Sequence, residues 1–329
     1  QICDKAAKNG ASFADTRTFE SDFTAVVRQD GRADKLNSGS SAGIGIRVIV
    51  DNAWGFASAS SLDSDSAYEA LDTAIAMAKA SSTKSDEAVV SECQPLVDVV
   101  TADPEIDPRS VSVERKMAAL EGYEQAGAAL LGNKLVNSIV SYSDRFSREH
   151  VCNTFGVDVT QESVRTILHC MFVARDGSIL QKGRGRVGKP CGFELIESTP
   201  AEDITIKAAK LADSLLSASA PPAGEFPVVF HPSVTGLLTH EAIGHNAEAD
   251  HVISGSSIIA GKIGEKIASD LVTIVDAATI PGKWGSYAYD SEGTPAAKRI
   301  IIENGVLRNY MHSLETAKRE FKEETGFEV

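Results

Sequence analysis

Residues 238–245 read Leu-Thr-His-Glu-Ala-Ile-Gly-His, and this stretch predicts more about the chain than any other. Two imidazoles and a carboxylate in an apolar helical run are costly to bury unless something binds them. Neutral imidazole nitrogen is a preferred zinc ligand, and a glutamate beside it can take a proton from metal-bound water. The stretch therefore indicates a metal site that contains His240, Glu241 and His245.

The spacing of the two histidines, H-E-x-x-x-H, is one residue longer than the familiar H-E-x-x-H. Positions five apart in an ideal α-helix lie roughly 140° apart, because each residue turns the chain by about 100°. Both rings can reach one ion only if the helix contains a π-type turn or ends there, and Gly244 lies where either can occur. The alternative is two unrelated histidines near a helix end, one capping and one exposed.

Several blocks around this stretch resemble the TldD/PmbA family, historically called modulators of DNA gyrase and regarded as zinc metallopeptidases. The blocks are 238–250, 264–269, 275–276, 290–295 and 302–307. They occur in the order that the family has, and a weaker N-terminal similarity extends the resemblance over nearly the whole chain. The H-E-x-x-x-H spacing marks the TldD-like branch, because the PmbA-like (TldE) partner lacks it.

The resemblance implies that His240 and His245 are zinc ligands and that Glu241 is the catalytic base. It also implies peptides or unfolded protein segments as substrates, admitted to a cavity between subunits. The implied assembly is a dimer, formed with a TldE/PmbA-like subunit or with a second copy of the chain.

The expected site departs from the family at its third zinc ligand. That ligand is a cysteine close to the family's C-terminus, beyond Val329, so we expect this chain to be truncated at its C-terminal end. Catalytic zinc usually has three protein ligands, so two histidines alone should hold it weakly. His251 is the nearest substitute, although an exposed loop histidine is the favoured interpretation. The alternative function is a catalytically inactive scaffold or binding subunit of a TldD/TldE-type assembly.

The composition is that of an ordinary globular protein, with 43% hydrophobic and 24% charged residues among 329. This length favours two domains. We predict an α+β fold, with a mixed α/β domain over residues 1–219. A β-rich C-terminal domain over residues 225–329 is expected to carry the H-E-x-x-x-H helix. Residues 220–224, Ala-Pro-Pro-Ala-Gly, are the best linker between the two.

The net charge of −14 argues against broad nucleic-acid binding, which depends on cations that neutralise phosphates. No apolar run approaches the roughly 18 residues of a membrane span. The five scattered cysteines form no C-x-x-C motif and are typical of free thiols in a reducing compartment. We therefore expect a cytoplasmic protein that contacts neither nucleic acid nor membrane directly.

Hydrophobic periodicity and turn residues predict the individual elements. The helices expected are 66–80, begun by Ser66 with Glu69 in a capping box, then 112–131, 200–218, 231–245 with Ser233 as N-cap, and 313–324. The strands expected are 23–29, 42–50, 54–58, several between 134 and 186, 227–230, 271–275, 298–303 and 306–312.

Residues 183–188 read Gly-Arg-Gly-Arg-Val-Gly and match the spelling G-x-G-x-x-G. A dinucleotide site would require a helix directly afterwards, and the sequence predicts none there. A glycine-rich turn with a solvated basic face is the favoured interpretation. Its cations, with Lys182 and Lys189, could contact RNA or an acidic peptide.

Three further features allow a structural or a functional interpretation. Residues 290–295 are a surface loop or, by the resemblance, part of the substrate groove beside the zinc helix. Glu248 and Asp250 either orient an imidazole of the metal site or are ordinary charges at a helix end. Cys191 could approach the metal, but a structural thiol is the favoured interpretation.

Overall fold

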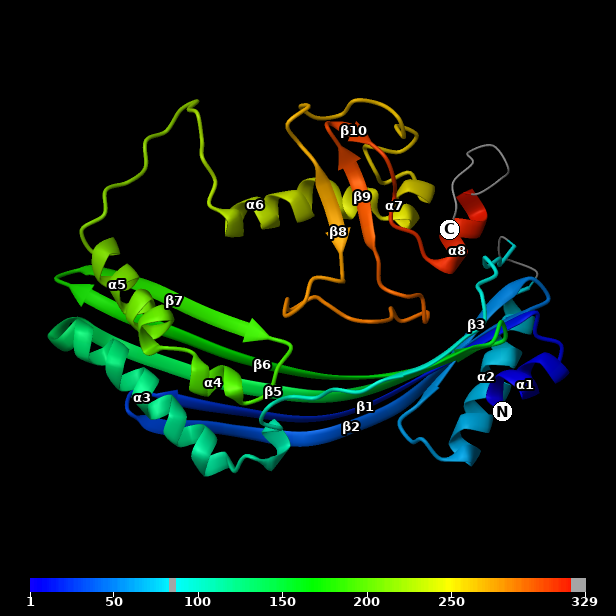
Figure 1. Ribbon diagram of the computed structural model, residues 1–329, viewed down its shortest axis with the longest axis horizontal. Coiled ribbons are helices and arrows are strands. Elements are labelled where there is room, and N and C mark those ends of the chain that lie inside the picture. Colours follow the sequence, from blue (N-terminus) through cyan, green and yellow to red (C-terminus); the bar gives the residue numbers. More distant parts are fainter. Residues whose placement is uncertain (83–86, 321–329) are drawn as a thin grey trace.

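The computed structural model describes residues 1–82 and 87–320, and its largest feature is a curved seven-stranded sheet (Figure 1). The strands run in the order β3-β2-β1-β5-β6-β4, and β7 also pairs with β6. All pairs are antiparallel except β4 with β6. The strands are β1 Phe13–Gln29, β2 Arg32–Val50, β3 Ala53–Ala59, β4 Leu96–Val100, β5 Leu135–Asn153, β6 Val157–Asp176 and β7 Ile179–Lys189.

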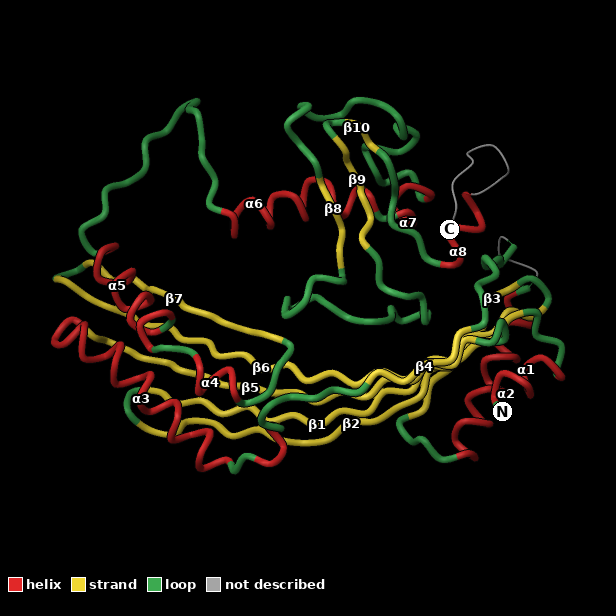
Figure 2. The backbone as a smooth tube through the Cα atoms, viewed as in Figure 1, coloured by secondary structure: helices red, strands yellow, loops and turns green. Residues whose placement is uncertain are grey.

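Two separate groups of helices cover one face of this sheet at its two ends (Figure 2). At one end α2 packs on β2 and β3, and at the other α3 and α5 pack on β5, β6 and β7. The helices are α1 Ile2–Lys8, α2 Ser64–Ser81, α3 Val113–Leu131, α4 Glu194–Ser198 and α5 Thr205–Leu215. Short 3₁₀ turns occupy Pro108–Ser110, Gly132–Lys134 and Ala201–Asp203.

The two helix groups explain why β1 is longer than the strand predicted over 23–29. Ala14 belongs to the core beneath α2, whereas Val26 belongs to the core beneath α3 and α5. Between them β1 carries polar residues such as Glu20 and Asp22, so the alternation of apolar and polar side chains is lost there. The hydrogen-bonded ladder nevertheless continues, because β2 and β5 flank β1 on both sides.

The apolar stripe predicted for the first long helix is confirmed, but its start is not. Ala67, Leu71 and Ala74 are buried against the sheet. The helix begins two residues earlier than predicted, because the Asp63 carboxylate accepts a hydrogen bond from the Ser66 backbone N–H. Carboxylates cap helices at least as well as hydroxyls do, so the nearer aspartate takes this role.

Residues 183–188 lie within β7, so the prediction of a glycine-rich turn there is wrong. The glycines are needed because α5 lies directly on the strand. A Cβ atom at Gly183 would lie 1.9 Å from the carbonyl oxygen of Ala208, and one at Gly185 would lie 2.7 Å from that of Ile204. This close packing, and not a phosphate, accounts for the glycine spacing.

Gly183→Ala is expected to destabilise the fold by about 1–3 kcal/mol, because α5 must move away from β7 to admit the methyl group. Urea unfolding followed by circular dichroism measures the change. Gly122→Ala on α3 is a matched control, because a Cβ there meets nothing within 4 Å. A loss at Gly183 no larger than at Gly122 would contradict the packing argument.

A smaller C-terminal part lies on the opposite side of the sheet from α3, α4 and α5 (Figure 1). Its core is built around residues such as Ile259, Ile302 and Leu307. Its elements are α6 Pro232–Thr239, a π-helical turn at His240–Gly244, a 3₁₀ turn at His245–Ala247, α7 Ala249–Ile253, α8 Leu314–Glu320, and the strands β8 Ile274–Ala277, β9 Lys298–Glu303 and β10 Val306–Leu307.

Helices combined with largely antiparallel sheets confirm the α+β class, whereas the domain limits 1–219 and 225–329 stay a prediction. Among the described residues, no helix is both long enough and apolar enough to cross a membrane. The helix predicted over 313–324 is present as α8, and residues 321–324 lie outside the described residues.

The prediction of a strand over 227–230 is wrong. These residues form no strand and pair with no strand of the described chain. Val229 is 99% exposed, so its β propensity meets no partner. Ser233 is also not the N-cap of α6. The His231 side chain caps that helix by accepting the backbone N–H of Ser233.

Polar contacts join the two parts of the chain. Arg47 of β2 pairs with Glu292 at 3.0 Å, and it also pairs with the buried carboxylate of Asp15. Glu292 accepts the backbone N–H of Leu314 through its other oxygen. The Tyr289 backbone carbonyl accepts a hydrogen bond from a sheet side chain. The contacts of Glu292 with Arg47 and of the Tyr289 carbonyl with the sheet hold the C-terminal part on the sheet.

Candidate metal centre

The helix that carries the two histidines changes its pitch at the point where they occur. Residues Pro232–Thr239 are α-helical, and His240–Gly244 form a π-helical turn. A π turn has more residues per turn than an α-helix, so positions five apart move toward one face. Of the two arrangements that the histidine spacing allows, a π turn or a helix end, the structure has the π turn.

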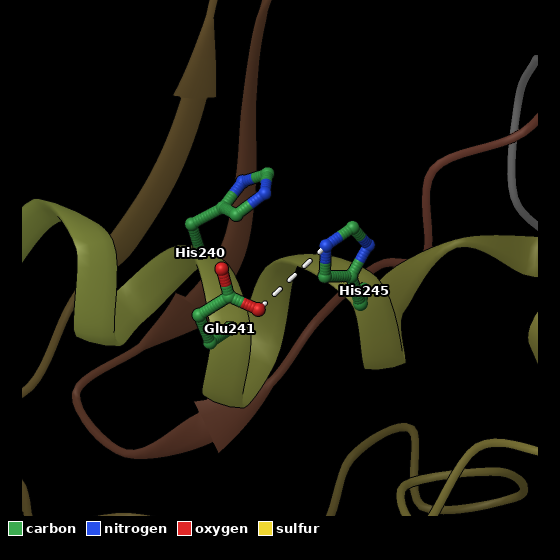
Figure 3. A group of neighbouring side chains, drawn as sticks. All are labelled: His240, Glu241 and His245. Atoms are coloured by element: carbon green, nitrogen blue, oxygen red, sulfur yellow. Dashed lines mark ion pairs between the residues drawn. The ribbon is translucent and has the colours of Figure 1, made fainter.

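The π turn places His240 and His245 on one side of the helix (Figure 3). Their ring centroids are 4.5 Å apart, with the planes at 68°. Glu241 lies beside them, with its Oε2 atom 3.9 Å from Nε2 of His245. One ligand atom from each of the three residues lies within 4.8 Å of the others, so the three donors can surround a single cation.

Glu248 fixes the orientation of one of the two rings. Its Oε1 atom is 2.8 Å from Nδ1 of His245. A carboxylate at Nδ1 favours the tautomer with the proton on that nitrogen and leaves the Nε2 lone pair free. Nε2 is the atom on the side of Glu241, so this contact aims the ligand atom at the shared point. It favours the functional interpretation of Glu248.

His251 is close to these residues but is not one of the converging donors. Its Nδ1 atom is 2.8 Å from the backbone carbonyl oxygen of His245, which can only accept, so Nδ1–H donates there. The His251 ring is 6.4 Å from that of His245 between centroids. With Glu248 and Asp250 it forms a second group of neighbouring donor atoms.

All three converging side chains are exposed, and so are residues 231–238, which precede them in the chain. Glu241 is 61% and His245 46% exposed. Exposure lets a hydrated cation or an extended polymer reach the three donors without movement of the fold. The chemistry of the set, two imidazoles with one carboxylate, suits a zinc ion.

Residues 290–295 serve the packing of the two parts of the chain. Asp290 Oδ1 accepts the backbone N–H groups of Glu292 and Thr294, which shapes the turn. Asp290 and Ser291 line a cavity of about 820 Å³ between the sheet and residues 278–291, and the histidines do not line it. Cys191 lines the same cavity and is not among the converging donors.

The sequence did not reveal the contact between Arg47 and Glu292, which are 245 positions apart. Their pairing depends on the C-terminal part folding back over β2, and no local pattern signals such a contact. The sequence shows Glu292 as an acidic residue of the 290–295 stretch, but it does not show that Arg47 is its partner.

A histidine–glutamate–histidine set on a helix is typical of zinc metallopeptidases. Sequence models of the PmbA/TldA metallopeptidases match three successive segments: domain 1 at residues 14–79, the central domain at 106–216 and the C-terminal domain at 223–329. The chain belongs to the PmbA/TldD family of metallopeptidases.

Curated relatives agree with this assignment. A metalloprotease of Methanocaldococcus jannaschii is 34% identical, over 95% of this chain and 69% of that protein. A metalloprotease of Methanothermobacter thermautotrophicus is 35% identical, over 93% of this chain and 65% of that protein. A zinc metalloprotease TldD homologue of Saccharolobus solfataricus is 26% identical over 309 residues. The chain spans about two thirds of the length of these relatives.

Solved structures share the fold. A protein named as a modulator of a DNA gyrase, from Thermotoga maritima, superposes with a TM-score of 0.81 at 23% identity, covering 97% of this chain and 71% of that one. TldE from Thermococcus kodakarensis gives 0.77 at 21% identity, covering 96% and 70%. These structural similarities show a shared fold and do not bear on the residues of the metal centre.

Proposed function

We propose that this chain is a TldD-like, zinc-dependent peptidase that hydrolyses peptides or unfolded protein segments. The convergence of His240, Glu241 and His245 on the π turn carries the proposal. His240 and His245 are the residues that would hold the zinc ion, and Glu241 is the general base. A bound zinc ion supplies Lewis acidity, which makes water easier to deprotonate and a peptide carbonyl easier to attack.

The residues of the chain supply the proton transfer. Glu241, exposed between the two rings, accepts a proton from the attacking water and passes it to the leaving amine. The contact with Glu248 favours the His245 tautomer that has its proton on Nδ1 and the Nε2 lone pair free. The exposed approach admits an extended peptide backbone to the three donors.

Zinc binding by the purified chain tests this proposal first. We expect zinc in stoichiometric amount at saturation, and its loss in His240→Ala and His245→Ala, measured by mass spectrometry of the native protein. His231→Ala is a matched control, because this histidine caps the same helix and lies outside the donor set. Zinc binding that is unchanged in both ligand variants would contradict the proposed site.

A second candidate function is an inactive scaffold or binding subunit of a TldD/TldE-type assembly. It is favoured by the donor set, because the described residues bring only two imidazoles and one carboxylate together, without a cysteine. Catalytic zinc usually has three protein ligands and a water. A folded chain without detectable zinc or hydrolysis, yet able to bind a TldE-like partner, would support the scaffold.

The proposal includes an assembly and a location. We place the chain in a dimer, with a TldE/PmbA-like subunit or with a second copy, and in the cytoplasm. The resemblance of the fold to TldE supports such an assembly. The cysteines, all free in the structure, are consistent with a reducing compartment. We expect no direct contact with nucleic acid.

Glu248→Ala is expected to weaken zinc binding about 10–100-fold, the usual loss when the partner of a ligating histidine is removed. The physical reason is that the His245 ring loses its fixed tautomer and orientation. Competition with a fluorescent zinc chelator measures the affinity. Asp250→Ala, which removes a neighbouring carboxylate that does not contact His245, should change it little. Equal losses in both variants would indicate a general charge effect.

A further inference from the structure

β7 carries a row of cations on the face of the sheet opposite to α5. Gly183 and Gly185 face α5, because Cβ atoms there would meet the backbone of that helix. Side chains alternate along a strand, so Lys182, Arg184 and Arg186 point to the other face. All three are exposed. We call these three residues the cationic row.

The cationic row lacks compensating charges. Within the described parts of the chain, its side chains make no ion pair and no hydrogen bond. In the register of the two strands, Arg186 lies opposite His169 of β6, and Arg184 lies opposite Met171. No carboxylate of β6 therefore lies directly opposite either arginine. The pKa of His169 is lowered mainly by burial. The positive charges of Arg184 and Arg186 lower it further, as expected for a locally positive surface. An uncompensated row is unusual in a chain of net charge −14.

The cationic row lies on the same side of the sheet as the metal centre. Gly188 continues the row, and a Cβ atom there would lie 2.9 Å from the Trp284 ring of the C-terminal part. Arg165 donates to the backbone carbonyl oxygens of Trp284 and Ser286. Figure 1 shows α6 above this face, with α3 and α5 on the far side. A chain bound along β7 therefore lies on the side where the histidines are.

We propose that the cationic row binds acidic segments of extended peptides, which selects substrates of the proposed peptidase. Alternate residues of a strand are about 6.7 Å apart, so three cations match carboxylates at every second position of an extended peptide. Three cations are too few to neutralise the phosphates of a polynucleotide. The role in substrate selection rests on the proposed function, but peptide binding itself does not.

Fluorescence anisotropy with short labelled peptides tests the cationic row. The protein is the full chain with Glu241→Gln, without added metal, so that cleavage plays no part. A peptide of alternating Glu and Ser should bind about tenfold more tightly than one of alternating Lys and Ser, and salt should weaken it. The pair Arg184→Gln and Arg186→Gln should reduce the affinity for the Glu peptide about five- to tenfold.

Lys207→Gln is the matched control, because this lysine of α5 is exposed and pairs with Asp203 at 2.8 Å. It should leave the binding unchanged. Equal affinity for both peptides, or no loss in the arginine variant, would overturn the proposal. Tighter binding of a single-stranded RNA that needs the same arginines would also overturn it. Hydrolysis of a neutral peptide, measured separately, reports on the proposed function alone.

A different observation concerns two thiols that are far apart in the sequence. Cys3 of α1 and Cys152 of β5 have their sulfur atoms 3.6 Å apart. Thr16 Oγ1 lies 3.0 Å from the Cys152 sulfur. The Cys3 residue is buried, and Cys152 is partly exposed. The two sulfur atoms are in contact, and one of them is reachable from solvent, so an oxidised Cys152 would form next to the Cys3 thiol.

We infer that a hydroperoxide oxidises Cys152 and Cys3 to a reversible disulfide. The Cys152 thiolate attacks the peroxide, the O–O bond breaks, and a sulfenic acid forms. The leaving hydroxide or alkoxide takes up the proton that the thiol had released and becomes water or an alcohol. The Cys3 sulfur then attacks the sulfenic sulfur, the S–O bond breaks, and water leaves with the Cys3 proton. Two thiols are oxidised and one peroxide is reduced. The hydrogen bond from Cys3, with one from Thr16, lowers the pKa of Cys152 to about 6, which favours the thiolate.

Peptide mapping under non-reducing conditions tests the thiol pair. After peroxide treatment of the full chain, we expect a Cys3–Cys152 cross-link and the loss of two hydrogen masses, both reversed by a dithiol reductant. Cys3→Ser should leave a sulfenic acid at Cys152 that a dimedone probe traps. Cys170→Ser, which removes a buried thiol elsewhere, should not alter the cross-link. Cross-links among other cysteines, or an unreactive Cys152, would overturn the inference.

Discussion

Glu241→Gln is expected to lower the rate of zinc-dependent peptide hydrolysis by about 10²–10⁴-fold, the usual contribution of a general base. Glutamine has nearly the same shape as glutamate but cannot accept the proton of the attacking water. Zinc affinity should change much less, because His240 and His245 remain. Steady-state cleavage of an unstructured fluorogenic peptide measures the rate, and a zinc competition assay on the same sample measures binding.

The matched control for this variant is Glu265→Gln, which neutralises an exposed glutamate outside the donor set. It should leave hydrolysis unchanged, which separates the role of a base from the effect of one charge. If Glu241→Gln cleaves as fast as the parent chain, Glu241 is not the base. If zinc is lost together with activity, the carboxylate is a ligand rather than a base.

Lys116→Met is expected to reduce the free energy of unfolding by about 3–5 kcal/mol, the cost of leaving a buried charge without its partner. Lys116 Nζ is 2.7 Å from Asp144 Oδ2, and the side chains are only 2% and 3% exposed. The pair joins α3 to β5 within the core. Replacement of the lysine leaves the Asp144 carboxylate buried next to the methionine. Urea unfolding gives the free energy.

Two further variants make this prediction specific. Lys207→Met removes a lysine whose pair with Asp203 is 68% and 55% exposed, so we expect less than about 1 kcal/mol. Lys116→Met combined with Asp144→Leu removes both charges and should recover much of the loss. A similar cost for the exposed and the buried lysine would show that the core pair contributes no more than a surface contact.

Much of the helical structure follows from the sequence because it depends on local periodicity. The stripe of α2 and the span of α3 need only side chains that recur with the helix repeat. Asn304 and Gly305 likewise form the turn between β9 and β10, both with positive φ. Such features depend on neighbours within a few residues, which the sequence displays directly.

Features that depend on distant partners were missed or misjudged. Residues 227–230 have strand propensity but no strand of the described chain beside them, so propensity alone misled. The glycines of β7 resembled a turn, although they serve the close approach of α5. The early half of β1 was overlooked because polar residues in the middle of the strand separate its buried part beneath α2 from the part beneath α3 and α5.

The sequence by itself determined the donor types of the candidate metal centre and the need for a π turn or a helix end, because His240 and His245 lie on different faces of a regular α-helix. Only the tertiary structure decided that Arg47 meets Glu292 and which side of the sheet faces the centre. The local chemistry depends on residues that are close together in the sequence. Long-range contacts depend on how the chain folds back on itself, and no short pattern encodes that.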